Sequence, residues 1–82
     1  MDRIYVELIV PVIGKKYEFI IPAVMKVGVV AELMAQAVSE TEGLNYDKNS
    51  LMLCLMDKNE VLPQNVSVEK AGITDGCQLL II

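Results

Sequence analysis

The beginning of the chain alternates between hydrophobic and polar positions. Between residues 3 and 10, every second position is hydrophobic: Ile4, Val6, Leu8 and Val10. A period of two is typical of a strand with one buried face. The same pattern returns at Tyr17, Phe19 and Ile21. Pro11 and Gly14 are turn signals between the two runs, and Pro22 cannot donate to a strand ladder. We therefore predict a hairpin of two strands that turns around residues 11–16.

The hydrophobic period changes after Pro22. Hydrophobic residues now recur at steps of three and four, at Val27, Val30, Leu33, Met34, Ala37 and Val38. This spacing places them on one face of a helix, which we predict to run from about Val27 to Thr41. Gly43 suits the left-handed residue that ends many helices. The start is less clear, because no capping side chain precedes it and Gly28 is costly in a first turn.

The second half of the chain predicts short strands. Leu51–Met56 is an unbroken hydrophobic run of strand length that follows a polar loop at residues 45–49. We predict further a short return strand near Glu60 to Leu62, one helical turn through Val68, Ala71 and Ile73, and a last strand from Gln78 to Ile82. The order is ββαββ, an α+β mixed sheet with one main helix packed across one face. With 82 residues, the chain is expected to form a single domain, residues 1–82.

Composition narrows the functional classes. Hydrophobic residues make up 54% of the chain and the mean hydropathy is +0.45. For so small a domain, this requires apolar side chains that face outward or are covered by a partner. The net charge of −4, with Lys15-Lys16 as the one adjacent basic pair, argues against nucleic acid as a partner. No hydrophobic run could span a bilayer and no signal-like segment opens the chain, so we expect a cytoplasmic protein without membrane insertion.

The residues for most catalytic sites are missing. The chain has no histidine, which excludes Ser-His-Asp and Cys-His nucleophiles and histidine-containing metal sites. Cys54 and Cys77 lack the spacing of a zinc or redox motif, and we expect free, packed thiols. No glycine-rich phosphate loop stands before the helix. Four acidic residues are expected on a solvated surface: Glu40, Glu42, Asp57 and Glu60. We therefore predict a protein that is not an enzyme and that has no cofactor or metal.

Strand parity gives a candidate binding surface. If Leu51, Leu53 and Leu55 face the helix, the side chains between them face away. The same parity sends Leu80 and Ile82 outward and Cys77 into the core, so a disulfide between Cys54 and Cys77 is not expected. The candidate protein-binding patch then comprises Met52, Cys54, Met56, Leu80 and Ile82. A contiguous apolar patch often marks a contact surface, and methionines repack to suit a partner. The alternative is a patch covered by the molecule's own loops or by a homodimer.

The order of these elements resembles ubiquitin over nearly the whole chain. The matching hydrophobic positions are Ile4 and Val6, then Val27, Val30 and Met34, then Leu53 and Val61, then Val68 to Ile73, and finally Leu79 and Ile81. The resemblance implies a ubiquitin-like β-grasp fold. It also places the candidate patch where ubiquitin presents its own apolar patch.

Two segments resemble more closely the small ubiquitin-like proteins of bacterial type VII secretion loci, the EsaB/YukD family. They are Ile21-Pro22-Ala23 leading through Val27 and Val30 to Leu33, and Ala71-Gly72-Ile73-Thr74-Asp75-Gly76 followed by Leu79 to Ile82. The resemblance implies an accessory role in the export of WXG100-type substrates, through contact with a secretion ATPase or membrane components.

The last residues lack the Gly-Gly tail that conjugated modifiers and sulfur carriers need, so we expect neither conjugation nor thiocarboxylate chemistry. The alternative function is a ubiquitin-like, non-catalytic subunit of a multicomponent enzyme, such as an aromatic monooxygenase.

Overall fold

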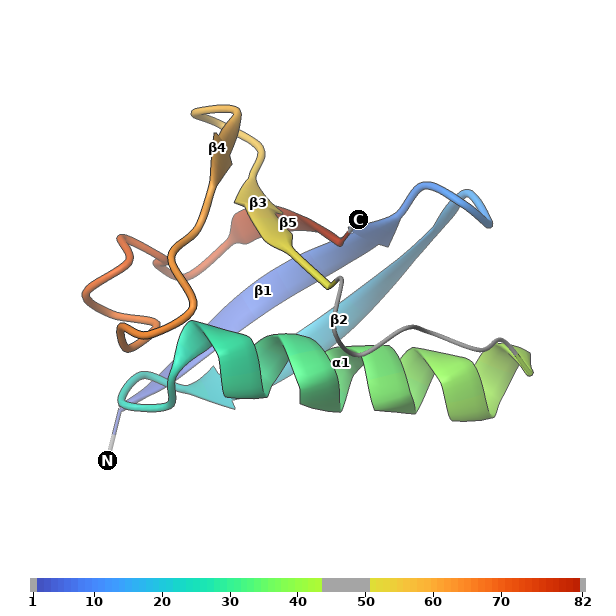
Figure 1. The fold of residues 1–82 in the computed structure, drawn as a ribbon, viewed down its shortest axis with the longest axis horizontal. Coiled ribbons are helices and arrows are strands. Elements are labelled where there is room, and N and C mark those ends of the chain that lie inside the picture. The colour runs from blue at the N-terminus through green and yellow to red at the C-terminus, as the bar shows by residue number, and fades with distance from the viewer. Residues whose placement is uncertain (1, 44–50, 82) are drawn as a thin grey trace.

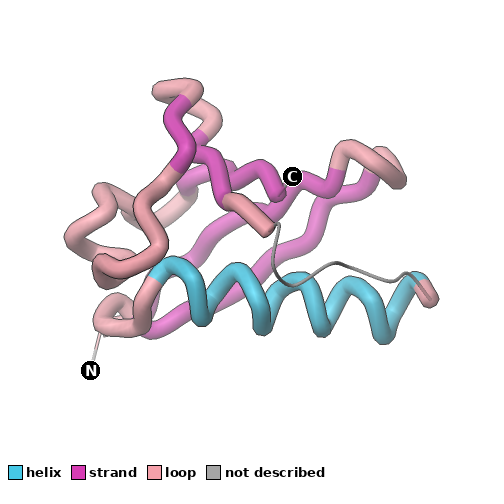
Figure 2. Tube along the Cα trace, in the orientation of Figure 1, coloured by secondary structure: helices cyan, strands magenta, loops and turns pink. Residues whose placement is uncertain are grey.

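The computed structural model describes residues 2–43 and 51–81. Their elements, in chain order, are β1 (Arg3–Val10), β2 (Lys15–Pro22), α1 (Val27–Glu42), β3 (Leu53–Leu55), β4 (Glu60–Val61) and β5 (Cys77–Ile81). Figures 1 and 2 show the strands in one twisted layer with α1 lying across one of its faces. The predicted ββαββ order is present, with the short return strand added as β4.

The five strands form one sheet in the order β2-β1-β5-β3-β4. β1 is antiparallel to β2 and parallel to β5, so the first and last strands lie side by side in the middle of the sheet. β3 is antiparallel to both β5 and β4. Among the described residues, β2 and β4 are therefore the two edges. Nowhere in residues 2–43 and 51–81 is there a helix with the length and hydrophobicity that crossing a bilayer requires.

The core lies between α1 and one face of the sheet. Its central sheet residues, Val6, Leu8 and Leu79, have no exposed surface. The buried helix residues are Val27, Val30, Ala31, Met34, Ala35 and Val38. Two predicted core positions were wrong, since Leu33 is 51% exposed and Ala37 is exposed. Ala31 and Ala35 are buried instead, at 2% and 3% exposure.

Helix α1 begins without a side-chain cap, as its sequence indicates. Lys26 precedes the helix and makes no capping hydrogen bond. The amides of Val27 and Gly28 instead donate to the carbonyl oxygens of Val66 (2.9 Å) and Gln64 (3.1 Å). These bonds satisfy two of the donors that a helix start leaves open. A Cβ atom at position 28 would lie 3.3 Å from both the Cβ and the carbonyl oxygen of Gln64, which explains the glycine.

The end of α1 follows the prediction. Gly43 is left-handed, with φ of 70°, and its amide donates to the carbonyl of Ser39 over 2.8 Å.

The later elements differ from their predicted bounds. β3 is shorter than the predicted strand of residues 51–56, and β5 begins one residue earlier than predicted. The predicted helical turn at residues 68–73 is a series of hydrogen-bonded turns that buries Val68 and Ile73. Gly76, with φ of 85°, then leads the chain into β5. The predicted polar loop at residues 45–49 lies outside the described residues.

One carboxylate ties the hairpin to the end of the helix. The Nζ atom of Lys15 lies 2.9 Å from Oε1 of Glu42, and the hydroxyl of Tyr17 donates to the other oxygen of the same carboxylate. Glu42 thus lies at the surface, as expected, but its carboxylate is paired and its side chain is 19% exposed. The hydrogen bond from Tyr17, and then that from Lys15, lowers the pKa of Glu42 below its ordinary value.

This arrangement predicts a pH-dependent contribution to stability. Because the pKa of Glu42 is lowered by folding, its contribution is complete above the ordinary pKa of a glutamate and is lost as the pH falls through the lowered pKa. The free energy of unfolding of the native protein should therefore exceed that of the Glu42→Gln variant at neutral pH. The difference between the two should shrink as the pH falls. Chemical denaturation across this pH range measures it.

A titration followed by NMR tests the cause. Tyr17→Phe should raise the pKa of Glu42 most, Lys15→Gln should raise it less, and Lys16→Gln serves as the control of equal charge change. An unaltered Glu42 pKa in Tyr17→Phe would contradict the assignment.

Candidate protein-binding surface

The face of the sheet opposite α1, called here the open face, carries alternate side chains of β3 and its flanks. Met52 and Met56 are 41% and 38% exposed, and Cys54 is half-buried between them. The residues of opposite parity, Leu51, Leu53 and Leu55, are buried. The period of two that parity predicts is therefore present. Whether these residues bind a partner stays a prediction.

Strand pairing joins these side chains to others on neighbouring strands. Cys54 pairs with Val61 on β4 and with Leu80 on β5, and Leu80 pairs with Ile9 on β1. Directly paired residues project their side chains to the same face of a sheet. Val61, Cys54, Leu80 and Ile9 therefore form a continuous apolar row across four strands, called here the open-face row. Ile82, the fifth residue of the predicted patch, lies outside the described residues.

Two members of the open-face row are absent from the sequence prediction. Val61 is 55% exposed, and Ile9 is half-buried. Their partners across the sheet depend on strand order and register, which the sequence pattern does not reveal. The sequence contains one signal for Ile9. It is hydrophobic, although it lies on the same side of β1 as Tyr5 and Glu7, the side predicted to face outward. A hydrophobic residue at an outward position is a mark of a contact surface.

An acidic border lies beside the apolar row. Glu7 of β1 is directly opposite Glu18 of β2, and it accepts a hydrogen bond from the side-chain amide of Gln78 over 3.1 Å. A hydrogen bond with Glu18 is the largest cause that raises the pKa of Tyr5, followed by burial and by the charges of Glu18 and Glu7. Two carboxylates face each other across the strands here, so this border favours a partner with positive charge.

The two cysteines lie on opposite faces of the sheet. Cys77 is buried on the helix side, and its Sγ atom accepts the amide of Thr74 over 3.3 Å. Cys54 belongs to the open-face row. Both thiols are free, in agreement with the parity argument against a disulfide. Over residues 2–43 and 51–81, no cluster of cysteine and acidic side chains could hold a metal ion.

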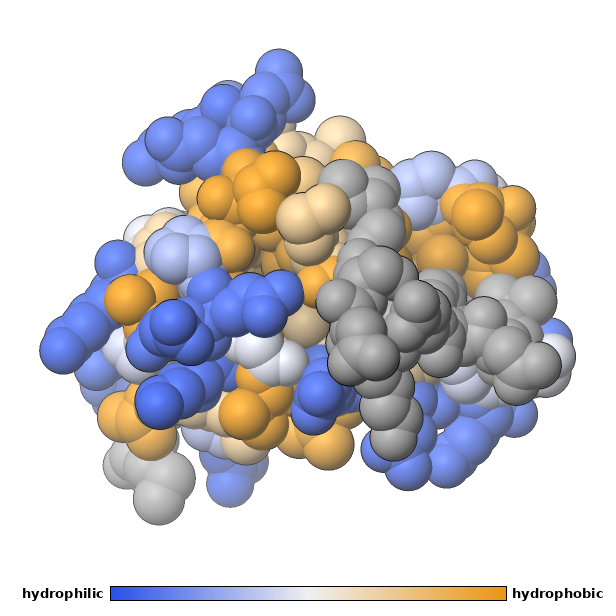
Figure 3. Space-filling view, viewed as in Figure 1, coloured by the Kyte–Doolittle hydropathy of each residue, from blue (hydrophilic) through white to orange (hydrophobic). Residues whose placement is uncertain are grey.

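Hydrophobic exposure also occurs away from the open-face row. Figure 3 shows hydrophobic residues at the hairpin between β1 and β2, where Val12 is 83% exposed. Ile20 on β2 is 68% exposed. These are the two largest exposed fractions among the large hydrophobic residues of the described chain.

Known proteins resemble this chain in structure. No protein-family model and no curated protein matches it. The ubiquitin-like domain of EccD5 from Mycobacterium xenopi matches with a TM-score of 0.79 and 18% identity, over 100% of this chain and 94% of that one. Ubiquitin from Caldiarchaeum subterraneum matches with a TM-score of 0.73 and 20% identity, over 99% and 92%. A chain of the MycP5-free ESX-5 inner membrane complex matches with a TM-score of 0.80 and 20% identity, over 100% of this chain and 21% of that one.

These matches establish the fold. The chain has the ubiquitin-like β-grasp fold, an α+β mixed sheet with one helix, so the fold prediction is confirmed. Ubiquitin-like domains of type VII secretion proteins are among its structural neighbours. The closer likeness to EsaB and YukD stays a prediction.

The placement of the thiols predicts their relative reactivity. In the folded protein, an alkylating reagent should modify Cys54 at least about tenfold faster than Cys77, because only Cys54 lies on a solvent-exposed face. Mass spectrometry of digests taken over time measures both rates. In denaturant the two rates should converge, which controls for differences in peptide detection. Equal rates in the folded state would contradict the assignment of the two faces.

Proposed function

We propose that this protein is a non-catalytic, cytoplasmic ubiquitin-like interaction module that serves a type VII secretion system as an accessory factor, in the manner of the EsaB/YukD proteins. The open-face row is the observation that carries the proposal. A fold hosts many functions, so the surface has to support the assignment. The structural likeness to the EccD5 domain and to a chain of the ESX-5 inner membrane complex supports the link to this secretion system.

The open-face row has the composition of a docking surface. Its apolar side chains come from four strands of one sheet, which holds them in fixed relative positions. Met52 and Met56 flank the row just beyond the two ends of β3, and their flexible thioethers adapt to an irregular partner surface. Leu80 lies at the centre, paired on both sides. Central apolar residues surrounded by less buried neighbours carry most of the energy of a typical interface.

The acidic border adds chemical selectivity. Glu7 and Glu18 lie next to the apolar row, and Lys16, two residues from Glu18 on the same face of β2, pairs with Ile9 at the end of that row. A partner with an apolar centre and lysine or arginine beside it would complement both features. We assign this role to a secretion ATPase or a membrane component of the type VII system.

Substitutions on the open face test the proposal. The full chain is titrated by calorimetry against purified cytosolic domains of the secretion ATPase and the membrane components from the same genome. Met52→Asp and Leu80→Asp should each raise the dissociation constant at least about tenfold, because a carboxylate would have to be desolvated in the apolar contact.

The control is matched in exposure. Val29 on α1 is 44% exposed, against 41% for Met52, and lies on the other side of the molecule. Val29→Asp should leave the affinity unchanged. Thermal unfolding confirms that each variant is folded, and Val61→Asp replaces Leu80→Asp if the latter is not. Affinities that are equal for Met52→Asp and Val29→Asp would refute the open face as the binding site.

A further inference from the structure

The outer edge of β2 carries backbone groups that the described sheet does not use. The amide of Ala23 donates to the carbonyl oxygen of Asp2 over 3.0 Å, and this pair continues the register of β1 with β2. Hydrogen-bonded and non-hydrogen-bonded pairs alternate along an antiparallel ladder. Residues 15, 17, 19 and 21 therefore direct their backbone groups to β1. Lys16, Glu18 and Ile20 direct their N–H and C=O groups outward, beyond the edge of the sheet.

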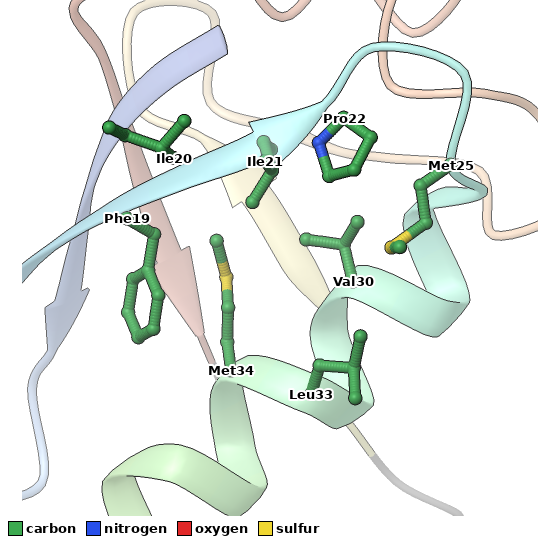
Figure 4. Close-up of a pocket in the computed structure, with 8 residues that line it drawn as sticks. All are labelled: Phe19, Ile20, Ile21, Pro22, Met25, Val30, Leu33 and Met34. Carbon is green, nitrogen blue, oxygen red and sulfur yellow. The ribbon is translucent and has the colours of Figure 1, made fainter. Parts of the chain in front are cut away.

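The pairing of β1 with β5 supports the same alternation of inward and outward backbone groups. Gly76 donates its amide to the carbonyl oxygen of Tyr5 over 2.8 Å, so Tyr5 directs its backbone toward β5 and not toward β2. Figure 4 agrees with the side-chain parity of β2: Phe19 and Ile21 lie toward α1, and Ile20 lies on the opposite side of the strand. Lys16, Glu18 and Ile20 thus direct their backbone groups beyond the edge of the sheet and their side chains to the open face.

We propose that this edge pairs with the same edge of a second copy of the chain, antiparallel about a two-fold axis at Tyr17. In this register Lys16 of each copy lies opposite Glu18 of the other, and each such pair exchanges two backbone hydrogen bonds. Both side chains project to the open face of the joined sheet, with their Cβ atoms about 5 Å apart. Opposite charges then meet twice across the interface, once on each side of the axis.

The sequence of β2 is self-complementary in this register and not in the neighbouring ones. A pairing centred on Glu18 would set two carboxylates directly opposite each other, which is unfavourable. A pairing centred on Phe19 would place Glu18 opposite Ile20 and Lys16 opposite Pro22, without an ion pair. Charged residues on an edge strand commonly discourage further pairing. Here Lys16 and Glu18 are two residues apart, so each lies opposite the other type when the same edge of a second chain pairs antiparallel to it.

Hydrophobic exposure favours the same register. With the axis at Tyr17, Ile20 lies opposite Gly14 of the second copy, beside the hairpin tip that carries Val12. Ile20 and Val12 are 68% and 83% exposed in the single chain. The dimer therefore places the exposed Ile20 beside the hairpin turn of the second copy, once on each side of the axis, and this contact removes apolar surface from water.

The edge of β2 shares Glu18 with the acidic border, but it contains no residue of the open-face row. The open-face row is centred on Leu80 and reaches Val61 on the opposite edge strand, so a partner can occupy it while β2 is paired. A single pair of strands forms a small interface, and we expect a dimer that depends on protein concentration. The inference therefore stands or falls separately from the proposed function.

Sedimentation velocity of the full chain, from about 1 µM to about 1 mM, tests the inference. The native protein should pass from monomer to dimer over this range. Lys16→Glu and Glu18→Lys should each raise the dissociation constant at least about tenfold, because each places like charges opposite each other at both ends of the interface. Combining the two substitutions restores opposite charges and should return the constant to within about threefold of the native value.

Two controls make the test specific. Lys58→Glu makes the same charge change in the turn between β3 and β4 and should leave the dimer unchanged, as should Met52→Asp. Raising the salt concentration should weaken the native dimer, and this measurement needs no variant. A monomer at every concentration would overturn the inference. A double exchange that dimerises as weakly as the single ones would also overturn it, because another surface would then hold the copies together.

Discussion

The parallel pairing of β1 with β5 is the constraint on which the remaining structure depends. It brings together segments from opposite ends of the described chain and buries Val6, Leu8 and Leu79 completely. Two bonds fix its register where β5 begins. Tyr5 accepts the amide of Gly76, and its own amide donates to the carboxylate of Asp75 over 2.9 Å. A slip of one residue would turn the core side chains of either strand to the open face, so this register also decides which residues are exposed.

The elements with a clear period could be predicted from the sequence. The alternation at Arg3–Val10 and the three- and four-residue steps of α1 each identify an element, because burial on one side imposes a period on the sequence. Strand parity on β3 and β5 likewise placed Met52, Cys54 and Leu80 on the open face. The strand order could not be predicted in this way, since it depends on contacts between distant segments. Ile9 and Val61 were missed for that reason.

The exact face of the helix was harder to predict from hydrophobicity alone. Leu33 is more hydrophobic than Ala31, and a pattern based on hydrophobicity therefore places it in the core. In the folded chain the buried face of α1 is the one that carries Ala31 and Ala35, and Leu33 lies outside it. Glu42 shows a related effect. Its interaction with Lys15 and Tyr17 joins two elements separated by some 25 residues of sequence, and no local pattern indicates it.

The start of α1 has a consequence for how local motions are coupled. Its first two amides are held by carbonyls of residues 64 and 66, and not by a side chain of its own segment. Protection of these amides against hydrogen exchange therefore depends on the ordering of a segment more than 35 residues later in the chain. When that segment opens, the first turn of the helix should fray with it, although no residue of the helix itself has changed. We therefore expect the two segments to open together.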